Sequence, residues 1–398
     1  MKNKKQLSLA IALMMGTTLG VQTMGMNSAS AEISDKFKME INGVIGYISD
    51  NDNLGGYTAK SQDTGDTESY WNSYTRLQLQ YHQDKNTMLQ ARLHSDYESF
   101  GTDYAKVGKT GSYFDQTFLQ VKDPKANMTY ILGKKGAFLG QGLIHNSSGN
   151  LTGAQVSFGN WYDPQCLQLL YGQKKDGSKF LAANYTKDVM KNWQVSLTGI
   201  RHDPLTNYTF KEDANGSYTN AADPSLHYSK IKRNQMHLLS IGSKIKGKGV
   251  TVQGEYVYNF ADEVGDGHSV SMKDGGKGKA YTNTLMDNSK SSRKGWYIEA
   301  YTGPTSDMTS GLPLQKPGTN VWSLKYQDVG ANATDAHNTT FFDDAKGWRL
   351  DYGHTFKKGL AADIAVAHMK DKGGSDFNDP ENGKWKTLVC AQVNYKFR

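Results

Sequence analysis

The chain has 398 residues, with 46 Lys or Arg against 39 Asp or Glu, giving a formal net charge of +7 with neutral histidines. This mild basic excess does not indicate a nucleic-acid partner. The mean hydropathy of −0.65 would ordinarily describe a soluble protein. A membrane β-barrel escapes that inference, because only alternate residues of its strands meet lipid. Abundant Gly (42) and Tyr (23) with scarce Pro (8) favour strands over helices.

The first 31 residues have the features of a secretory signal peptide. Three lysines among the first five residues precede an apolar run, Leu7–Val21, and Ala29-Ser30-Ala31 is a cleavage motif before Glu32. We therefore predict cleavage between Ala31 and Glu32, a mature chain of residues 32–398, and a net charge of +4 after removal of the three lysines. No later run of 18 apolar residues exists, so the sequence predicts no spanning helix.

Segments that alternate apolar and polar residues recur along the mature chain, as strands with a period of two require. In 37–48, for example, Phe37, Met39 and Ile41 alternate with Lys38 and Glu40. We predict strands within 37–48, 74–83, 88–99, 117–122, 128–134, 153–158, 167–171, 181–185, 193–197, 236–245, 250–260, 296–300, 322–326, 348–356, 362–366 and 384–398.

The connections between these segments alternate in length. Most odd-numbered strands are followed by long polar stretches, and most even-numbered strands by short turns. This asymmetry is typical of an antiparallel up-and-down outer-membrane barrel with an even strand number and periplasmic termini. Two connections break the rule, since the Asp176-Gly177 turn is short and the link 303–318 is long. We therefore predict an all-β transmembrane barrel of about 16 strands, with 14 or 18 as alternatives.

The last segment, Lys384–Arg398, has the pattern expected of a strand that closes a barrel. One face carries Trp385, Val389, Val393, Tyr395 and Phe397, and the other is mostly polar. A terminal amphipathic strand with aromatic residues resembles the closing strand of Gram-negative outer-membrane barrels. This chain departs from that pattern in ending with Arg398 rather than with the aromatic residue. A soluble β-sandwich is the alternative, but the charged polar face of 88–99 does not suit a packed interior.

The leader, the size, the strand pattern and the closing strand together resemble the general porin family. The resemblance implies a water-filled channel for passive diffusion of small hydrophilic solutes and ions across the outer membrane. It also implies contact with outer-membrane lipid and a homotrimer, although no sequence feature identifies an interface. In general porins the loop after the fifth strand folds into the pore, and by order that loop is 135–152 here.

Charged residues at positions facing the lumen are the candidate site. The predicted constriction loop contains no Asp or Glu, which departs from the family and favours a weak preference for anions. The candidates are Lys134, Lys135 and His145 at the loop, the bases Arg76, Arg92, Lys122 and Arg349, and the acids Glu40, Asp96, Glu98 and Asp351.

Other functions have weaker support in the sequence. An adhesin or structural barrel would use the long segments 203–232 and 261–293 to bind a partner. An outer-membrane hydrolase is less favoured, because His145-Asn146-Ser147 is the only tempting cluster and no G-x-S-x-G motif occurs. Neither a phosphate-binding loop nor a metal motif is present, so we expect no cofactor and no enzymatic activity. Cys166 and Cys390 are expected to be separate, inward-facing thiols.

Overall fold

The computed structural model describes residues 35–49, 69–95, 112–159, 166–174, 178–203, 210–212, 218–220, 226–228, 236–261, 270–272, 279–281, 293–330, 332–335, 345–372 and 385–398. The predicted signal peptide and its cleavage site lie outside these residues. No helix within the described ranges has the length and hydropathy of a membrane-spanning helix.

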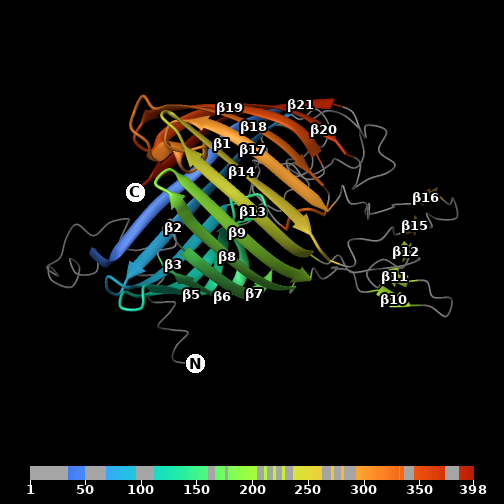
Figure 1. Ribbon diagram of the computed structural model, residues 1–398, viewed down its shortest axis with the longest axis horizontal. Coiled ribbons are helices and arrows are strands. Elements are labelled where there is room, and N and C mark those ends of the chain that lie inside the picture. The colour runs from blue at the N-terminus through green and yellow to red at the C-terminus, as the bar shows by residue number, and fades with distance from the viewer. Residues whose placement is uncertain are drawn as a thin grey trace.

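Within the described residues, sixteen antiparallel strands close into one barrel, as predicted (Figure 1). Each strand pairs with its neighbours in barrel order, and β1 pairs with β21. The barrel strands are β1 (Phe37–Ser49), β2 (Ser69–His82), β3 (Thr87–Ser95), β4 (Ser112–Asp123), β5 (Met128–Leu139), β6 (His145–Phe158), β7 (Cys166–Lys174), β8 (Lys179–Met190), β9 (Trp193–Asp203), β13 (Met236–Lys246), β14 (Val250–Asn259), β17 (Lys294–Thr302), β18 (Asn320–Val329), β19 (Ala345–Lys357), β20 (Leu360–Asp371) and β21 (Trp385–Phe397).

The predicted alternation sets which residues face outward. In β18, Trp322 and Leu324 are about half exposed on the outer surface, whereas Ser323 and Lys325, which alternate with them, are buried on the inner side. The same pattern recurs around the barrel, so the outer surface carries exposed apolar side chains and the inner surface carries most of the buried polar ones. An apolar exterior is what contact with lipid requires.

Aromatic side chains gather near both ends of the outer surface. In β19, Trp348 and Phe356 are eight residues apart, which is about 26 Å along a strand. Neighbouring rings contact each other in the pairs Trp296–Tyr326, Trp348–His368 and His368–Trp385 near one end, and Trp322–Tyr352, Phe37–Tyr81 and Tyr395–Phe397 near the other. Two aromatic belts separated by an apolar band match the two interfaces of a bilayer.

The seam between β1 and β21 explains the departure at the C-terminus. Ile41 pairs with Phe397, so Arg398 lies beside Glu40 of β1. The Arg398 guanidinium donates from Nε to Glu40 Oε2 at 2.6 Å, and Lys396 Nζ lies 3.2 Å from Glu40 Oε1. The terminal base therefore forms an ion pair across the closure of the barrel.

The connections define two ends of the barrel. The turn end carries the short connections 83–86, 124–127, 191–192, 247–249 and 358–359, and the loop end is opposite. Both irregular connections occur within the 16-strand barrel. Lys174 in β7 is joined to Lys179 in β8 by only 175–178, and the long link 303–319 joins β17 to β18 at the turn end. The alternatives of 14 and 18 strands are therefore wrong.

A second, small sheet was not predicted. Its five strands are β10 (Phe210–Glu212), β11 (Tyr218–Asn220), β12 (Leu226–Tyr228), β15 (Val270–Met272) and β16 (Lys279–Tyr281). These strands come from the two long loop-end connections, and β12 pairs with β15, which joins the two connections (Figure 1). Three-residue strands in polar sequence are too short for an alternating pattern to reveal them.

A charge placed in the apolar band should destabilise the barrel. Leu324 is 54% exposed on the outer surface near the middle of β18. We expect Leu324→Arg to lower the free energy of unfolding in lipid vesicles by about 2–4 kcal/mol, because the charge loses water at the bilayer centre. Ile245→Arg, outward-facing near the turn end, should cost about 0–1 kcal/mol. Equal effects of the two substitutions would contradict this placement of the membrane.

Candidate functional site in the barrel interior

The hairpin that joins β5 to β6 folds into the barrel. Residues 135–139 belong to β5 and 145–152 to β6, so the predicted loop 135–152 is largely strand and the loop proper is 140–144. The pairing shifts between Lys135 and Ala137, where Lys135 faces Leu151 but Ala137 faces Ser147. Such an irregularity bends a strand pair. We call residues 137–147 the inward hairpin.

The tip of the inward hairpin is anchored by Glu255 of β14. The backbone N–H groups of Gln141 and Leu143 donate to Glu255 Oε2 at 2.9 and 2.8 Å, and Ser240 Oγ donates to Oε1 at 2.6 Å. Gly140 adopts φ 63°, and a Cβ at this position would collide with the Glu255 carboxylate. The tip therefore requires glycine here, both for its backbone conformation and for its approach to the wall.

Further contacts join the tip to strands distant in barrel order. The Gly140 N–H donates to Asn184 Oδ1 of β8 at 3.0 Å, and the Tyr297 hydroxyl of β17 donates to the Gln141 carbonyl at 2.7 Å. These partners lie on the inner face of the barrel, as Glu255 does. The hairpin thus spans the interior from its own strands to β14 and β17.

Apolar side chains hold the inward hairpin against the same arc of wall. Leu139, Leu143 and Ile144 are fully buried. They belong to one cluster with inward-facing side chains of β7 to β18, namely Leu170, Phe180, Ala182, Ile200, Leu238, Val257, Tyr297 and Val329. Burying a leucine or isoleucine side chain contributes about 1.5–3 kcal/mol. The inner wall under the hairpin therefore combines these apolar side chains with the polar groups that anchor the tip.

A second carboxylate, Asp335, joins the hairpin to the connection that follows β18. Its oxygens accept hydrogen bonds from His145 Nδ1 at 2.6 Å, from His202 Nδ1 at 2.5 Å and from Lys174 Nζ. The Asp335 N–H also donates to the Ile144 carbonyl at 3.2 Å. We call these four side chains the Asp335 clasp. Burial raises the pKa of Asp335, but the two histidine hydrogen bonds and the Lys174 charge outweigh this and hold the pKa well below its ordinary value.

Ser178, His202 and Asp335 lie in the order of a hydrolase triad. Ser178 Oγ lies 2.7 Å from His202 Nε2, and His202 Nδ1 faces Asp335. In a serine hydrolase this chain activates the serine as a nucleophile. Here Ser178 is only 1% exposed, and Asp335 is shared with His145 and Lys174. These contacts support a structural role in holding the hairpin.

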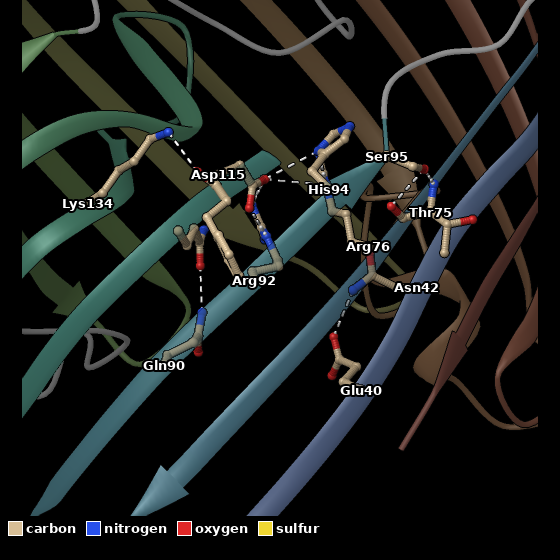
Figure 2. A network of polar contacts seen from close by, with 12 residues as sticks. Glu40, Asn42, Thr75, Arg76, Gln90, Arg92, His94, Ser95, Asp115 and Lys134 are labelled. Carbon is tan, nitrogen blue, oxygen red and sulfur yellow. Dashed lines mark hydrogen bonds and ion pairs between the residues drawn. The ribbon is translucent and has the colours of Figure 1, made fainter. Parts of the chain in front are cut away.

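Arg76, Arg92 and His94 form a polar cluster with Asp115 on the inner face of β2 to β4 (Figure 2). Arg92 forms two hydrogen bonds with Asp115, from Nε at 2.8 Å and from Nη2 at 2.6 Å. Arg76 Nε lies 3.0 Å from His94 Nδ1 and 3.7 Å from Asp115 Oδ2. Two guanidinium groups therefore share one carboxylate, which leaves this part of the wall electropositive.

A second polar group lies on the inner face of β17 to β20. Arg349 donates from Nε to both carboxylate oxygens of Asp351 at 2.9 Å, and Lys325 lies 3.8 Å from Glu299. Asp363 accepts from Gln392 at 3.1 Å and from Asn394. The structure thus brings Arg349 and Asp351 together, but places them on a different arc from Arg76 and Arg92.

The remaining predicted residues are dispersed. Lys134 Nζ donates to the Phe114 carbonyl at 2.9 Å and so borders the Arg92 cluster, and Lys135 Nζ lies 5.0 Å from the centre of the Phe118 ring (Figure 2 shows Lys134). Lys122 is exposed near the turn end, and Glu40 belongs to the seam. Asp96 and Glu98 lie outside the described residues.

Asp115 and Asp335 are not among the residues that the sequence predicts for the site. The sequence predicts a fourth strand that begins at Thr117, but β4 begins at Ser112 and has an irregular register where Arg92 pairs with Gln116 and Leu93 with Phe114. The extra residue is Asp115, which the bulge directs at Arg92. Asp335 lies in a connection with no periodic pattern, so no sequence signal distinguishes it there.

The described residues contain no group of three or more His, Cys, Asp or Glu side chains arranged to hold a metal ion. Cys166 and Cys390, both buried and inward-facing, form no disulfide.

Comparison with solved structures places the fold. OprB of Pseudomonas putida, in a high-pH structure, is similar over 93% of this chain and 96% of its own, with a TM-score of 0.54 and 10% identity. OmpF of Salmonella typhi, in complex with daunomycin, is similar over 91% of this chain and 97% of its own, with a TM-score of 0.50 and 11% identity. No protein-family model matches the chain, and no curated protein matches its sequence. The chain therefore has the barrel fold of Gram-negative porins.

Removing the Glu255 carboxylate should release the hairpin tip. In Glu255→Ala the N–H groups of Gln141 and Leu143 lose their acceptor, and each stranded buried group costs about 1–3 kcal/mol. We expect faster amide hydrogen exchange at these two residues, with the barrel still closed. Glu299→Ala is the matched control, because Glu299 accepts from Ser323 and Gln253 and not from the hairpin. Unchanged protection at Leu143 in Glu255→Ala would show that the anchor is assigned wrongly.

The Asp335 clasp should persist in mild acid. A carboxyl whose pKa is lowered by folding adds stability that is present above its unfolded pKa of about 3.9 and is lost as pH falls through the folded pKa. We therefore expect the protection of the His145 amide, relative to intrinsic exchange, to be the same at pH 7 and pH 5. Asp335→Asn should reduce it at both values. Loss of protection in the unsubstituted chain between pH 7 and 5 would contradict a lowered pKa of Asp335.

Proposed function

We propose that this chain is an outer-membrane porin, a channel for passive diffusion of small hydrophilic solutes and ions. The observation that carries the proposal is the closed 16-strand barrel with an apolar, aromatic-belted exterior and a polar interior. Barrels of this size leave an aqueous channel, whereas eight-stranded barrels are filled by side chains. The exported, outer-membrane mature chain 32–398 is part of this proposal.

In this proposal the inward hairpin is the constriction. It is fixed by two carboxylates, Glu255 at Gln141 and Leu143 and Asp335 at Ile144 and His145, and it packs on the arc from β7 to β18. Solutes would then pass beside the hairpin, along the polar arcs that carry Arg92 and Arg349. The residues 135–152 supply no acid to this passage.

We further propose a modest preference for anions. Support comes from the Arg76, Arg92 and Asp115 cluster, where two bases share one acid, and from Lys135 of β5, two residues before the inward hairpin. The other polar arc acts against this preference, because its three acids outnumber its two bases; the acids are Glu299, Asp351 and Asp363, and the bases are Lys325 and Arg349. A small net positive field in a narrow aqueous path favours anion entry without excluding cations.

An adhesive barrel is the second candidate. The observation that favours it is the small sheet, which joins the two longest connections at the loop end through β12 and β15. Joined loops offer a more ordered surface to a partner than separate ones. A homotrimer, implied by the resemblance to general porins, is compatible with both functions, and chemical cross-linking in detergent tests it.

Planar-bilayer recording tests the channel. We expect the refolded mature chain to give stepwise, ohmic openings, because water fills the path beside the hairpin. Under a salt gradient the reversal potential should have the sign of an anion-preferring pore, and Arg92→Gln should move it toward cations. Arg201→Gln, an exposed outward-facing base, is the control and should leave the potential unchanged. A folded, inserted barrel without conductance would reject the channel and favour the adhesive function.

A further inference from the structure

We propose that the link between β17 and β18 forms a second constriction, at the turn end of the barrel. This inference rests on the proposed channel function. The link runs from 303 to 319, whereas 83–86, 191–192 and 247–249 show how short the connections at this end are. Joining two adjacent antiparallel strands needs only about two residues. The extra length is therefore not required by the barrel itself.

The link folds back against the inner wall. Met308 and Leu312 are buried in a cluster with Val321 of β18 and Ala361 of β20, both of which face inward. Gly353 of β19 lies directly beneath it, since a Cβ there would collide with Leu312 and meet Met308 Sδ at 2.8 Å. The contact thus depends on the absence of a side chain from the inner face of β19.

Hydrogen bonds fix the link to the same strands. Thr355 Oγ1 donates to the Leu312 carbonyl at 3.0 Å, the Gly359 N–H donates to the Pro313 carbonyl at 2.9 Å, and the Gly318 N–H donates to the Thr355 carbonyl at 2.8 Å. Gln392 of β21 reaches Thr309 Oγ1 at 3.4 Å. These hydrogen bonds fix the link against the inner face of the barrel.

The link also has internal order. The Ser310 N–H donates to Asp307 Oδ1 at 2.8 Å and the Leu312 N–H donates to the Asp307 carbonyl at 2.9 Å, which leads into the short 3-10 helix Leu312–Leu314. While Leu312 and Pro313 pack on the wall, Asp307, Leu314 and Lys316 are exposed. These exposed groups are the side of the link that would border the solute path.

The two inserts lie against different arcs and enter from opposite ends. The inward hairpin descends from the loop end onto β7 to β18, and the link rises from the turn end onto β18 to β21. A solute that enters from the loop end would pass the hairpin first and the link second. The link should therefore contribute its own part of the resistance and of the size limit.

Shortening the link tests this directly. In the variant, residues 303–319 are replaced by Asn-Gly, a pair suited to a two-residue hairpin turn. We expect its single-channel conductance to be about 1.5 to 2 times that of the unsubstituted chain, because two constrictions in series add their resistances. Flux of neutral oligosaccharides into vesicles should extend to larger sizes.

A labelling experiment gives a second readout that does not require refolding a shortened chain. In a background of Cys166→Ser and Cys390→Ser, Leu314→Cys places a thiol at an exposed position of the link, where Leu314 is 43% exposed. A bulky thiol reagent added from the turn-end side should lower conductance by about half. Lys248→Cys, in the exposed ordinary turn at the same end, is the control and should show no change.

The outcomes separate the two proposals. Conductance of the unsubstituted chain that neither shortening nor labelling changes would overturn the second constriction and leave the porin intact. Silence of both the unsubstituted and the shortened barrels, when folded, would reject the porin and show that the link does not limit flux. If the shortened chain fails to fold, a labelled Leu314→Cys channel that conducts as before overturns the inference, and one that conducts less supports it.

Discussion

Backbone hydrogen bonding in the absence of water is the constraint on which this structure depends. A strand that meets lipid must pair on both edges, so the sheet has to close on itself. Closure brings β1 and β21 together and puts Glu40 beside Lys396 and Arg398. It also divides every strand between two solvents, which is why outward leucine and tryptophan alternate with inward lysine, serine and glutamine in β18.

The same constraint acts inside the barrel, where loop backbone is buried against a wall. In the inward hairpin, Glu255 accepts hydrogen bonds from two backbone N–H groups at the tip, and Tyr297 donates one to a tip carbonyl. In the link, Thr355 and Gly359 donate hydrogen bonds to the carbonyls of Leu312 and Pro313. In both inserts, a few polar groups satisfy the backbone while leucines supply the burial. The apolar inner arcs and the apolar inserts therefore depend on one another.

The barrel could be predicted because alternation is a property of each strand by itself. Strand number and facing follow from it, and the even count follows from the alternating lengths of the connections. The site was less accessible. Asp115 faces the interior because of a bulge, and Asp335 lies in a connection without a periodic pattern. The bend before Ala137 depends on a shift in strand pairing, which the polar sequence of residues 145–152 does not indicate. These contacts join residues far apart in sequence, so their partners are set by tertiary packing that no local pattern reports.

The long-range nature of these contacts has a consequence for how the chain assembles. Glu255 is 114 residues from Gln141, and Arg398 is 358 residues from Glu40. The hairpin tip cannot form its contacts until β14 has joined the sheet, and β1 cannot pair with β21 until that last strand is present. Contacts of such separation make folding slow. Until β14 has joined the sheet, the hairpin tip and its leucines lack the wall they pack on, and exposed apolar surface of this kind promotes aggregation during folding.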